Sequence, residues 1–186
     1  MKIPNANRKK ALIVVDVQPR FINEKNSYIL PKIQMLLERV PYTVYFQALF
    51  YAEENSIWDK QINWTLPKAN NMYVPDPLGS ALAERNAVSV VKTTRSAFKG
   101  EPSIFQILNE HSVDEVHIVG VDTDDCITAT AHEASDLGFF TYIIEECCQS
   151  RRQELHERAV ANLRQTKLTN NSCGENIDFI ELNVAW

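Results

Sequence analysis

The run Ala11-Leu-Ile-Val-Val-Asp16 decides the fold class, because it predicts a strand that is buried on both faces. Five consecutive apolar residues without alternation are typical of central strands in a parallel sheet covered by helices on either side. Further short β-rich runs lie at 43–49, 88–91, 116–119, 139–144 and 177–182. Segments with helical spacing of apolar residues lie between them, at 31–40, 102–111, 127–137 and 155–163.

Strands that alternate with helices predict an α/β fold, in which a parallel sheet lies between two helical layers joined by right-handed crossovers. The length of 186 residues favours a single domain over residues 1–186. A stretch at about 51–77 fits neither period and is expected to be an irregular excursion. It is either a lid or binding loop, or a surface insertion packed by its own aromatic residues.

Composition narrows the functional classes. The net charge of −5 argues against nucleic acid or an anionic membrane as the main partner, since both require a basic field. No apolar run approaches the ~20 residues of a membrane span, and residues 1–10 lack the apolar stretch of a signal peptide. Four cysteines give no disulfide framework, so the expected location is cytoplasmic.

Three chemically useful side chains follow the predicted strands. Asp16 closes the first strand, Lys92 closes the third, and Cys126 lies in the turn after the fourth. Ligands of open parallel sheets bind outside the carboxyl ends of the strands. We therefore expect a carboxylate, an ammonium and a thiol to meet at one edge of the sheet.

The surroundings of Cys126 bear on its reactivity. If Thr123 or Asp124 caps the following helix, the sulfur lies in the first helical turn. Free amides and the helix dipole lower a thiol pKa there, whereas the acidic residues of 122–125 raise it. The ammonium of Lys92 is the candidate group that would favour the thiolate.

Four segments together resemble the isochorismatase-like cysteine hydrolases. They are residues 11–21 (the opening strand), 90–98 (the lysine segment), 119–131 (the nucleophile segment) and 145–159 (after the fifth strand). With their order and spacing, the resemblance covers about residues 11–163. It implies a Rossmann-like three-layer α/β/α fold with a six-stranded parallel sheet in the order 3-2-1-4-5-6.

The resemblance also implies a triad of Asp16, Lys92 and Cys126 that hydrolyses a C–N bond in a small amide or carbamoyl compound. Cys126 would attack the carbonyl carbon and form a thioester. Asp16 would move the thiol proton to the leaving nitrogen and then activate water, while Lys92 balances the charge. A cis peptide bond is implied at Val121–Asp122. The backbone N–H groups of Asp122 and Cys126 would form the oxyanion hole.

Two features of the substrate pocket stay open on sequence alone. The side chain of Asp122 either faces the pocket, where it would repel acidic substrates, or turns outward. The candidate pocket walls are aromatic, and for each of them core packing is the alternative, most strongly for Phe21 and Phe98. These residues are Phe21, Phe50, Trp58, Trp64 and Phe98.

The chain departs from the metal-binding members of that family. Nicotinamidases carry an Asp-x-His pair just after the second strand, where this chain has Ala48 and Phe50. The histidines lie beyond the lysine segment without metal-ligand spacing, so we expect no metal and no cofactor. They are His111, His117, His132 and His156.

A metal-independent cysteine hydrolase with a small-molecule substrate is therefore the leading interpretation. The alternatives are an isochorismatase-type ether hydrolase that uses Asp16 as its acid, and a binding protein that kept the fold without catalysis. The resemblance implies a homo-oligomer, a dimer or a tetramer, in which the apolar end at 184–186 is a candidate contact. Cys147 and Cys148 are expected to pack in the core and Cys173 to be exposed.

Overall fold

The sheet is built from six parallel strands, and its middle strand is the run that opened the sequence analysis. The computed structural model describes residues 8–169 and 177–180, with side chains for residues 8–164. The strands are β1 Lys10–Val15, β2 Val44–Phe50, β3 Val88–Lys92, β4 Glu115–Gly120, β5 Phe140–Cys148 and β6 Ile177–Ile180. Their order is β3-β2-β1-β4-β5-β6, and every neighbouring pair is parallel, which confirms the predicted topology.

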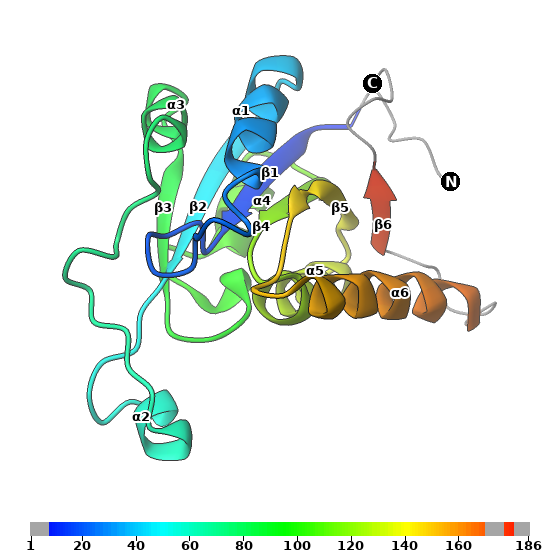
Figure 1. Ribbon diagram of the computed structural model, residues 1–186. Helices are drawn as coiled ribbons and strands as arrows, with labels where there is room; N and C mark the ends of the chain where they lie inside the picture. The colour runs from blue at the N-terminus through cyan, green and yellow to red at the C-terminus, as the bar shows by residue number, and fades with distance from the viewer. Residues whose placement is uncertain (1–7, 170–176, 181–186) are drawn as a thin grey trace.

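Helices cover both faces of this sheet (Figure 1). They are α1 Ile29–Arg39, α2 Ile57–Ile62, α3 Leu78–Glu84, α4 Ile104–Glu110, α5 Thr128–Asp136 and α6 Gln153–Thr169. Helices α1 and α3 pack with Leu12 and Val14 of β1, whereas α4, α5 and α6 share the other core with Ala11, Ile13 and Val15. Successive residues of β1 thus point into two different cores, which is why the strand needs an unbroken apolar run.

The register of the central strands brings their carboxyl ends level. Val15 pairs with Ala48 of β2 on one side and with Gly120 of β4 on the other. Asp16 lies one residue beyond this line, and its N–H donates to the carbonyl oxygen of Ala48 at 2.9 Å. The chain therefore leaves the middle of the sheet where α/β proteins bind ligands.

The excursion at 51–77 is largely irregular, as predicted, but it contains one short helix that the sequence did not predict. Helix α2 projects away from the sheet (Figure 1). The side chain of Ser56 caps this helix by accepting a hydrogen bond from the N–H of Asp59. Six residues are too few to display a helical period, so the pattern could not reveal the helix. An antiparallel bridge between Ala52 and Leu66 ties the excursion together near its base.

The cysteines differ in their burial. Cys147 and Cys148 are both buried, as predicted, whereas Cys126 is partly exposed. Cys173 and residues 184–186 lie outside the described residues. Among the helices that the structure describes, none is long and apolar enough to cross a membrane.

Gly120 supplies a test of how closely β4 approaches β1. Its φ is +120°, and an added Cβ would lie 2.1 Å from the carbonyl oxygen of Val15. Gly138 also has a positive φ, +93°, but an added Cβ there meets nothing within 4 Å. We expect Gly120→Ala to lower the free energy of unfolding by about 3 kcal/mol, because backbone strain and overpacking add.

The matched control, Gly138→Ala, is expected to lower the free energy of unfolding by about 1 kcal/mol, since only backbone strain applies. Urea unfolding followed by circular dichroism measures both values. Equal losses for the two variants would contradict the close approach at Gly120.

Candidate active site

Asp16, Lys92 and Cys126 meet above the carboxyl ends of β1, β3 and β4. The Nζ of Lys92 donates a hydrogen bond to Oδ2 of Asp16 at 2.8 Å and lies 3.6 Å from Sγ of Cys126. Asp16 is 2% exposed and Lys92 is 1% exposed. A buried carboxylate, a buried ammonium and a partly exposed thiol thus form one contiguous group.

Lys92 reaches Asp16 although β3 is two strands away from β1. Its side chain crosses the end of β2, where Nζ lies 4.9 Å from the centroid of the Phe50 ring. The carbonyl oxygens of Thr94 and Arg95 each accept a hydrogen bond from Nζ at 3.0 Å. Three fixed oxygen acceptors therefore hold the ammonium in place and satisfy its three N–H groups.

The backbone conformation of Asp16 directs its carboxylate toward the Lys92 ammonium. Its φ of +53° is in the left-handed region, which aspartate tolerates better than most residues but which still costs about 1 kcal/mol. Oδ2 accepts from Lys92, whereas Oδ1 is buried and has no hydrogen-bond partner in the part of the chain that the structure describes. The carboxylate thus keeps one acceptor atom open.

The protonation of the site is governed first by burial. Burial raises the pKa of Asp16, and the ammonium of Lys92 opposes this shift. Burial also raises the pKa of the Cys126 thiol, Asp16 raises it further, and Lys92 offsets only part of the effect. The neutral thiol form of Cys126 is therefore favoured at rest.

The sequence left open whether the helix end or the neighbouring acidic residues would dominate the pKa of this thiol. The segment Thr123–Ile127 is a turn of π-helix whose N-cap is Asp122, and no side chain caps it. Thr123 Oγ1 instead hydrogen-bonds Nδ1 of His156 at 2.8 Å, and the N–H of Asp124 donates to Oγ of Ser150 at 3.2 Å. Neither Thr123 nor Asp124 caps this turn with its side chain. Burial affects the pKa of Cys126 more than the helix end does.

The peptide bond between Val121 and Asp122 is cis, at the place that the resemblance implies. The N–H of Val121 donates to the carbonyl oxygen of Val15 at 3.0 Å, and the N–H of Thr123 donates to that of Gln149 at 3.2 Å. Between them, the N–H of Asp122 has no acceptor among the described residues. It is therefore available to a bound oxygen atom.

A cavity of about 440 Å³ opens above Cys126. Four of the five predicted wall residues line it: Phe21, Phe50, Trp58 and Trp64. Their rings pack against one another, with centroids 5.4 Å apart for Phe50 and Trp58 and 5.8 Å apart for Phe50 and Trp64. The irregular excursion contributes both tryptophans and so supplies one side of the cavity.

Phe98 was predicted as a wall residue, and that prediction is wrong. The 3-10 turn Ala97–Lys99 directs its ring into the core beside α4 and α5, where it stacks on Phe139 with centroids 6.0 Å apart. Phe98 is therefore a core residue, which was the alternative given for it in the sequence analysis.

Asp122 is among the residues that line the cavity. Burial raises the pKa of this carboxyl to about 6, and Asp124 adds to the effect while Arg151 opposes it. Its carboxyl oxygens make no hydrogen bond or ion pair with any residue that the structure describes.

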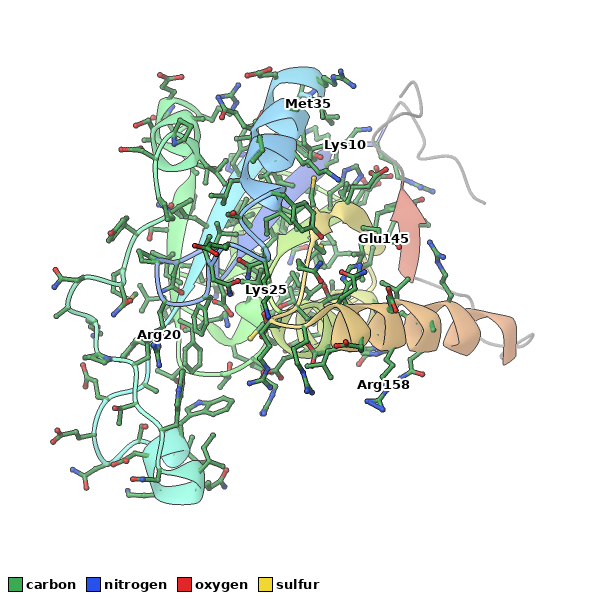
Figure 2. All side chains as sticks on the ribbon, viewed as in Figure 1. Lys10, Arg20, Lys25, Met35, Glu145 and Arg158 are labelled. Carbon is green, nitrogen blue, oxygen red and sulfur yellow. The ribbon has the colours of Figure 1, made fainter. Side chains whose placement is uncertain are left out.

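Sequence reasoning missed the charged residues around the cavity mouth. Arg95 forms an ion pair with Asp125, and its guanidinium lies over the Trp58 ring at 4.6 Å from the centroid. Arg20, labelled in Figure 2, and Arg151 also line the cavity. All three arginines lie just after the carboxyl ends of strands, and that position was the available signal.

The residues present do not fit a metal ion at the position used by nicotinamidases. The side chains of Ala48 and Phe50 have no ligand atom, and both are buried in apolar packing. In the described part of the chain, no three histidine, cysteine, aspartate or glutamate side chains are grouped so as to hold a metal. His117 instead bonds Tyr42 and Glu115 beneath the sheet.

Comparisons with known proteins agree with this architecture. The model of the isochorismatase domain matches residues 10–172. An uncharacterized isochorismatase family protein of Bacillus subtilis is 28% identical over 151 residues, which are 74% of this chain and 72% of that protein. The maleamate amidohydrolase of Pseudomonas putida is 25% identical over 169 residues, covering 81% and 76% of the two chains.

Solved structures agree in fold. The pyrazinamidase/nicotinamidase of Streptococcus mutans superposes with a TM-score of 0.76 at 20% identity, over 92% of this chain and all of that one. The nicotinamidase of Staphylococcus aureus gives a TM-score of 0.68 at 26% identity, over 91% and 96% of the two chains. Since the family model spans every element that carries the site, this protein belongs to the isochorismatase family and is a hydrolase.

Proposed function

We propose that this hydrolase cleaves the C–N bond of a small amide or carbamoyl compound through a thioester on Cys126, without a metal ion. The observation that carries the proposal is the contact of Lys92 Nζ with both Asp16 Oδ2, at 2.8 Å, and Cys126 Sγ, at 3.6 Å. An acid–base carboxylate and a nucleophile share one ammonium at the base of a cavity. This is the arrangement that nucleophilic catalysis requires.

The first half-reaction forms the thioester. The open Oδ1 of Asp16 accepts the thiol proton, and the sulfur attacks the carbonyl carbon of the amide. Lys92 stabilises the negative charge as it moves from the carboxylate to the sulfur. The carbonyl oxygen gains charge and takes hydrogen bonds from the N–H groups of Asp122 and Cys126. Asp16 then gives its proton to the leaving nitrogen, and the C–N bond breaks.

The second half-reaction restores the enzyme. Asp16 removes a proton from water, which attacks the thioester carbon, and the carboxylic acid leaves as the sulfur regains the proton. A neutral resting thiol is suited to this cycle, because a single proton moves between Asp16 and its partners while Lys92 stays charged.

The cavity limits the size and shape of the substrate. Its volume of about 440 Å³ accommodates a small molecule, and four aromatic rings form one side. Flat amides fit such a wall by stacking. The amide substrate in the name of the Pseudomonas putida relative is of this small class. The homo-oligomeric assembly expected from the sequence stays a prediction.

The nucleophile and the base can be tested by substitution. We expect Cys126→Ala to lower kcat/KM for small amides at least about 10³-fold, because the thioester route is lost. Asp16→Asn is expected to lower it about 10²–10⁴-fold, because the proton transfer is lost. Turnover of a panel of aromatic carboxamides and ureido acids, followed by ammonia release, measures both effects.

Cys147→Ala is the matched control, since Cys147 lies in the opposite core and is buried away from the cavity. It is expected to keep its activity within about threefold, with some loss of stability. If Cys126→Ala retained turnover while Asp16→Asn did not, the thioester would be wrong and Asp16 alone would carry the chemistry.

The pH dependence of kcat/KM tests the role of Lys92. As a general base, Asp16 must be ionised, so activity falls as the pH drops through its pKa. Burial raises that pKa and Lys92 lowers it. Lys92→Met removes the lowering contribution, and the acidic limb of the profile should therefore move to higher pH.

Lys99→Met is the control for this shift, because Lys99 pairs with Glu133 on the surface and is 64% exposed. Its acidic limb should stay in place. Asp122 is present in all three proteins, so its own titration does not distinguish them. An unchanged limb in Lys92→Met, or one moved to lower pH, would contradict the assigned role of Lys92.

A further inference from the structure

We infer that Asp122 is a substrate-binding residue whose carboxylate selects amides that carry a cationic or N–H-donating group close to the scissile carbonyl. The inference rests on the proposed function, because it places the amide above Cys126. It concerns the substrate class rather than the chemistry, and it can fail while the chemistry holds.

The first argument is the missing partner of this carboxylate. Of the other acidic groups near the nucleophile, Asp16 pairs with Lys92 and Asp125 with Arg95. Asp124 has a buried carboxylate oxygen without a partner among the described residues, but it does not line this cavity. Asp122 lines the cavity, and its carboxyl oxygens contact no donor in the described part of the chain. A partly buried carboxylate without hydrogen bonds is unfavourable, and a ligand with donor groups would relieve that cost.

The second argument is the position of this group relative to the reacting atoms. The backbone N–H of Asp122 is one of the proposed oxyanion donors, and its own carboxylate lies on the same residue. A negative charge so close opposes the negative charge that develops on the carbonyl oxygen. A cationic or donor group on the substrate would neutralise the carboxylate and remove this penalty.

The third argument is the local field. The ionisable groups that face Asp122 come from the chain after β1, the π-helical turn and the chain after β5. They are Asp16, Asp124, Asp125, Cys126 and Arg151. Three of them are carboxyls, whereas Arg151 forms no ion pair within 4.0 Å and is exposed. Lys92 pairs with Asp16 and Arg95 pairs with Asp125, so Asp122 is the carboxylate lining the cavity that keeps no ion-pair partner among the described residues.

Depth sets the order in which a substrate meets these charges. Arg20, Arg95 and Arg151 are exposed, whereas Asp122 is half-buried beside Cys126. A group one bond from the scissile carbonyl is thus closer to Asp122 than to the rim. A carboxylate at that position would meet repulsion, and an ammonium or a ureido N–H would find an acceptor.

Three amides test this selectivity: glycinamide, propionamide and malonamate. They differ only in the group one carbon from the amide carbonyl, which is an ammonium, a methyl or a carboxylate. Dissociation constants are measured by NMR titration on Cys126→Ala, which binds the amides without cleaving them. Near pH 7, where Asp122 is ionised, glycinamide should bind at least about tenfold more tightly than malonamate.

Adding Asp122→Asn to this background should bring the ratio of the two dissociation constants to within about twofold of one, because the charge is lost while the shape is kept. Asp124→Asn is the matched control. It removes the same charge two residues away, but Asp124 does not line this cavity. With Asp124→Asn, the ratio of the glycinamide and malonamate dissociation constants should stay within about twofold of its value in Cys126→Ala alone. Thermal unfolding of each variant establishes that it is folded.

The preference should also depend on pH. Since the pKa of Asp122 is raised to about 6, its carboxylate is present above that pH and protonated below it. The ratio should therefore fall between about pH 7 and about pH 5, while glycinamide and malonamate keep their own charges.

Two results would overturn the inference. One is a ratio that Asp122→Asn leaves unchanged. The other is malonamate binding most tightly and losing affinity in Arg151→Gln, which would assign recognition to the arginine. Failure of the proposed function has a different signature, namely no turnover of any amide when Cys126 is intact.

Discussion

The ion pair between Lys92 and Asp16 is the interaction on which the rest of the site depends. Both side chains are almost fully buried, so each needs the other to offset the loss of hydration. Removing one partner of such a pair typically costs 3–5 kcal/mol, roughly a third or more of the stability of a domain. The pair also joins the two halves of the proposed catalytic group, because the same ammonium contacts Cys126. Stability and chemistry thus rest on one contact.

The fold supplies the geometry for this pair. A strand with two buried faces must be apolar, and its first polar residue, Asp16, then appears where the strand leaves the sheet. The neighbouring strands end at the same level, so the turns after them carry Cys126 and the residues around it to the same edge. The excursion adds the aromatic side of the cavity, which the sheet itself could not provide.

Much of this could be predicted from local pattern and from the resemblance of four segments. The strand order follows from the resemblance, whereas the three catalytic candidates and four of the aromatic wall residues follow from positions along the chain. What could not be predicted depends on tertiary packing. Burial raises the pKa of Cys126, an effect that local pattern does not reveal, and the fixed carbonyls of Thr94 and Arg95 hold Lys92 across β2. The direction of the Phe98 ring depends on the three-residue turn Ala97–Lys99. The place of Asp122 at the cavity depends on the backbone around it.

The central claim is that an acyl group passes through the sulfur of Cys126, and a rapid-quench mass measurement tests it most directly. The enzyme is mixed with a turned-over amide, quenched in acid during the steady state, and digested. The account predicts a peptide containing Cys126 whose mass is increased by the acyl group, and loss of that increase after treatment with hydroxylamine. Steady turnover with no acylated Cys126 peptide at any quench time, and an unlabelled acid product formed at an unchanged rate by Cys126→Ala, would contradict it.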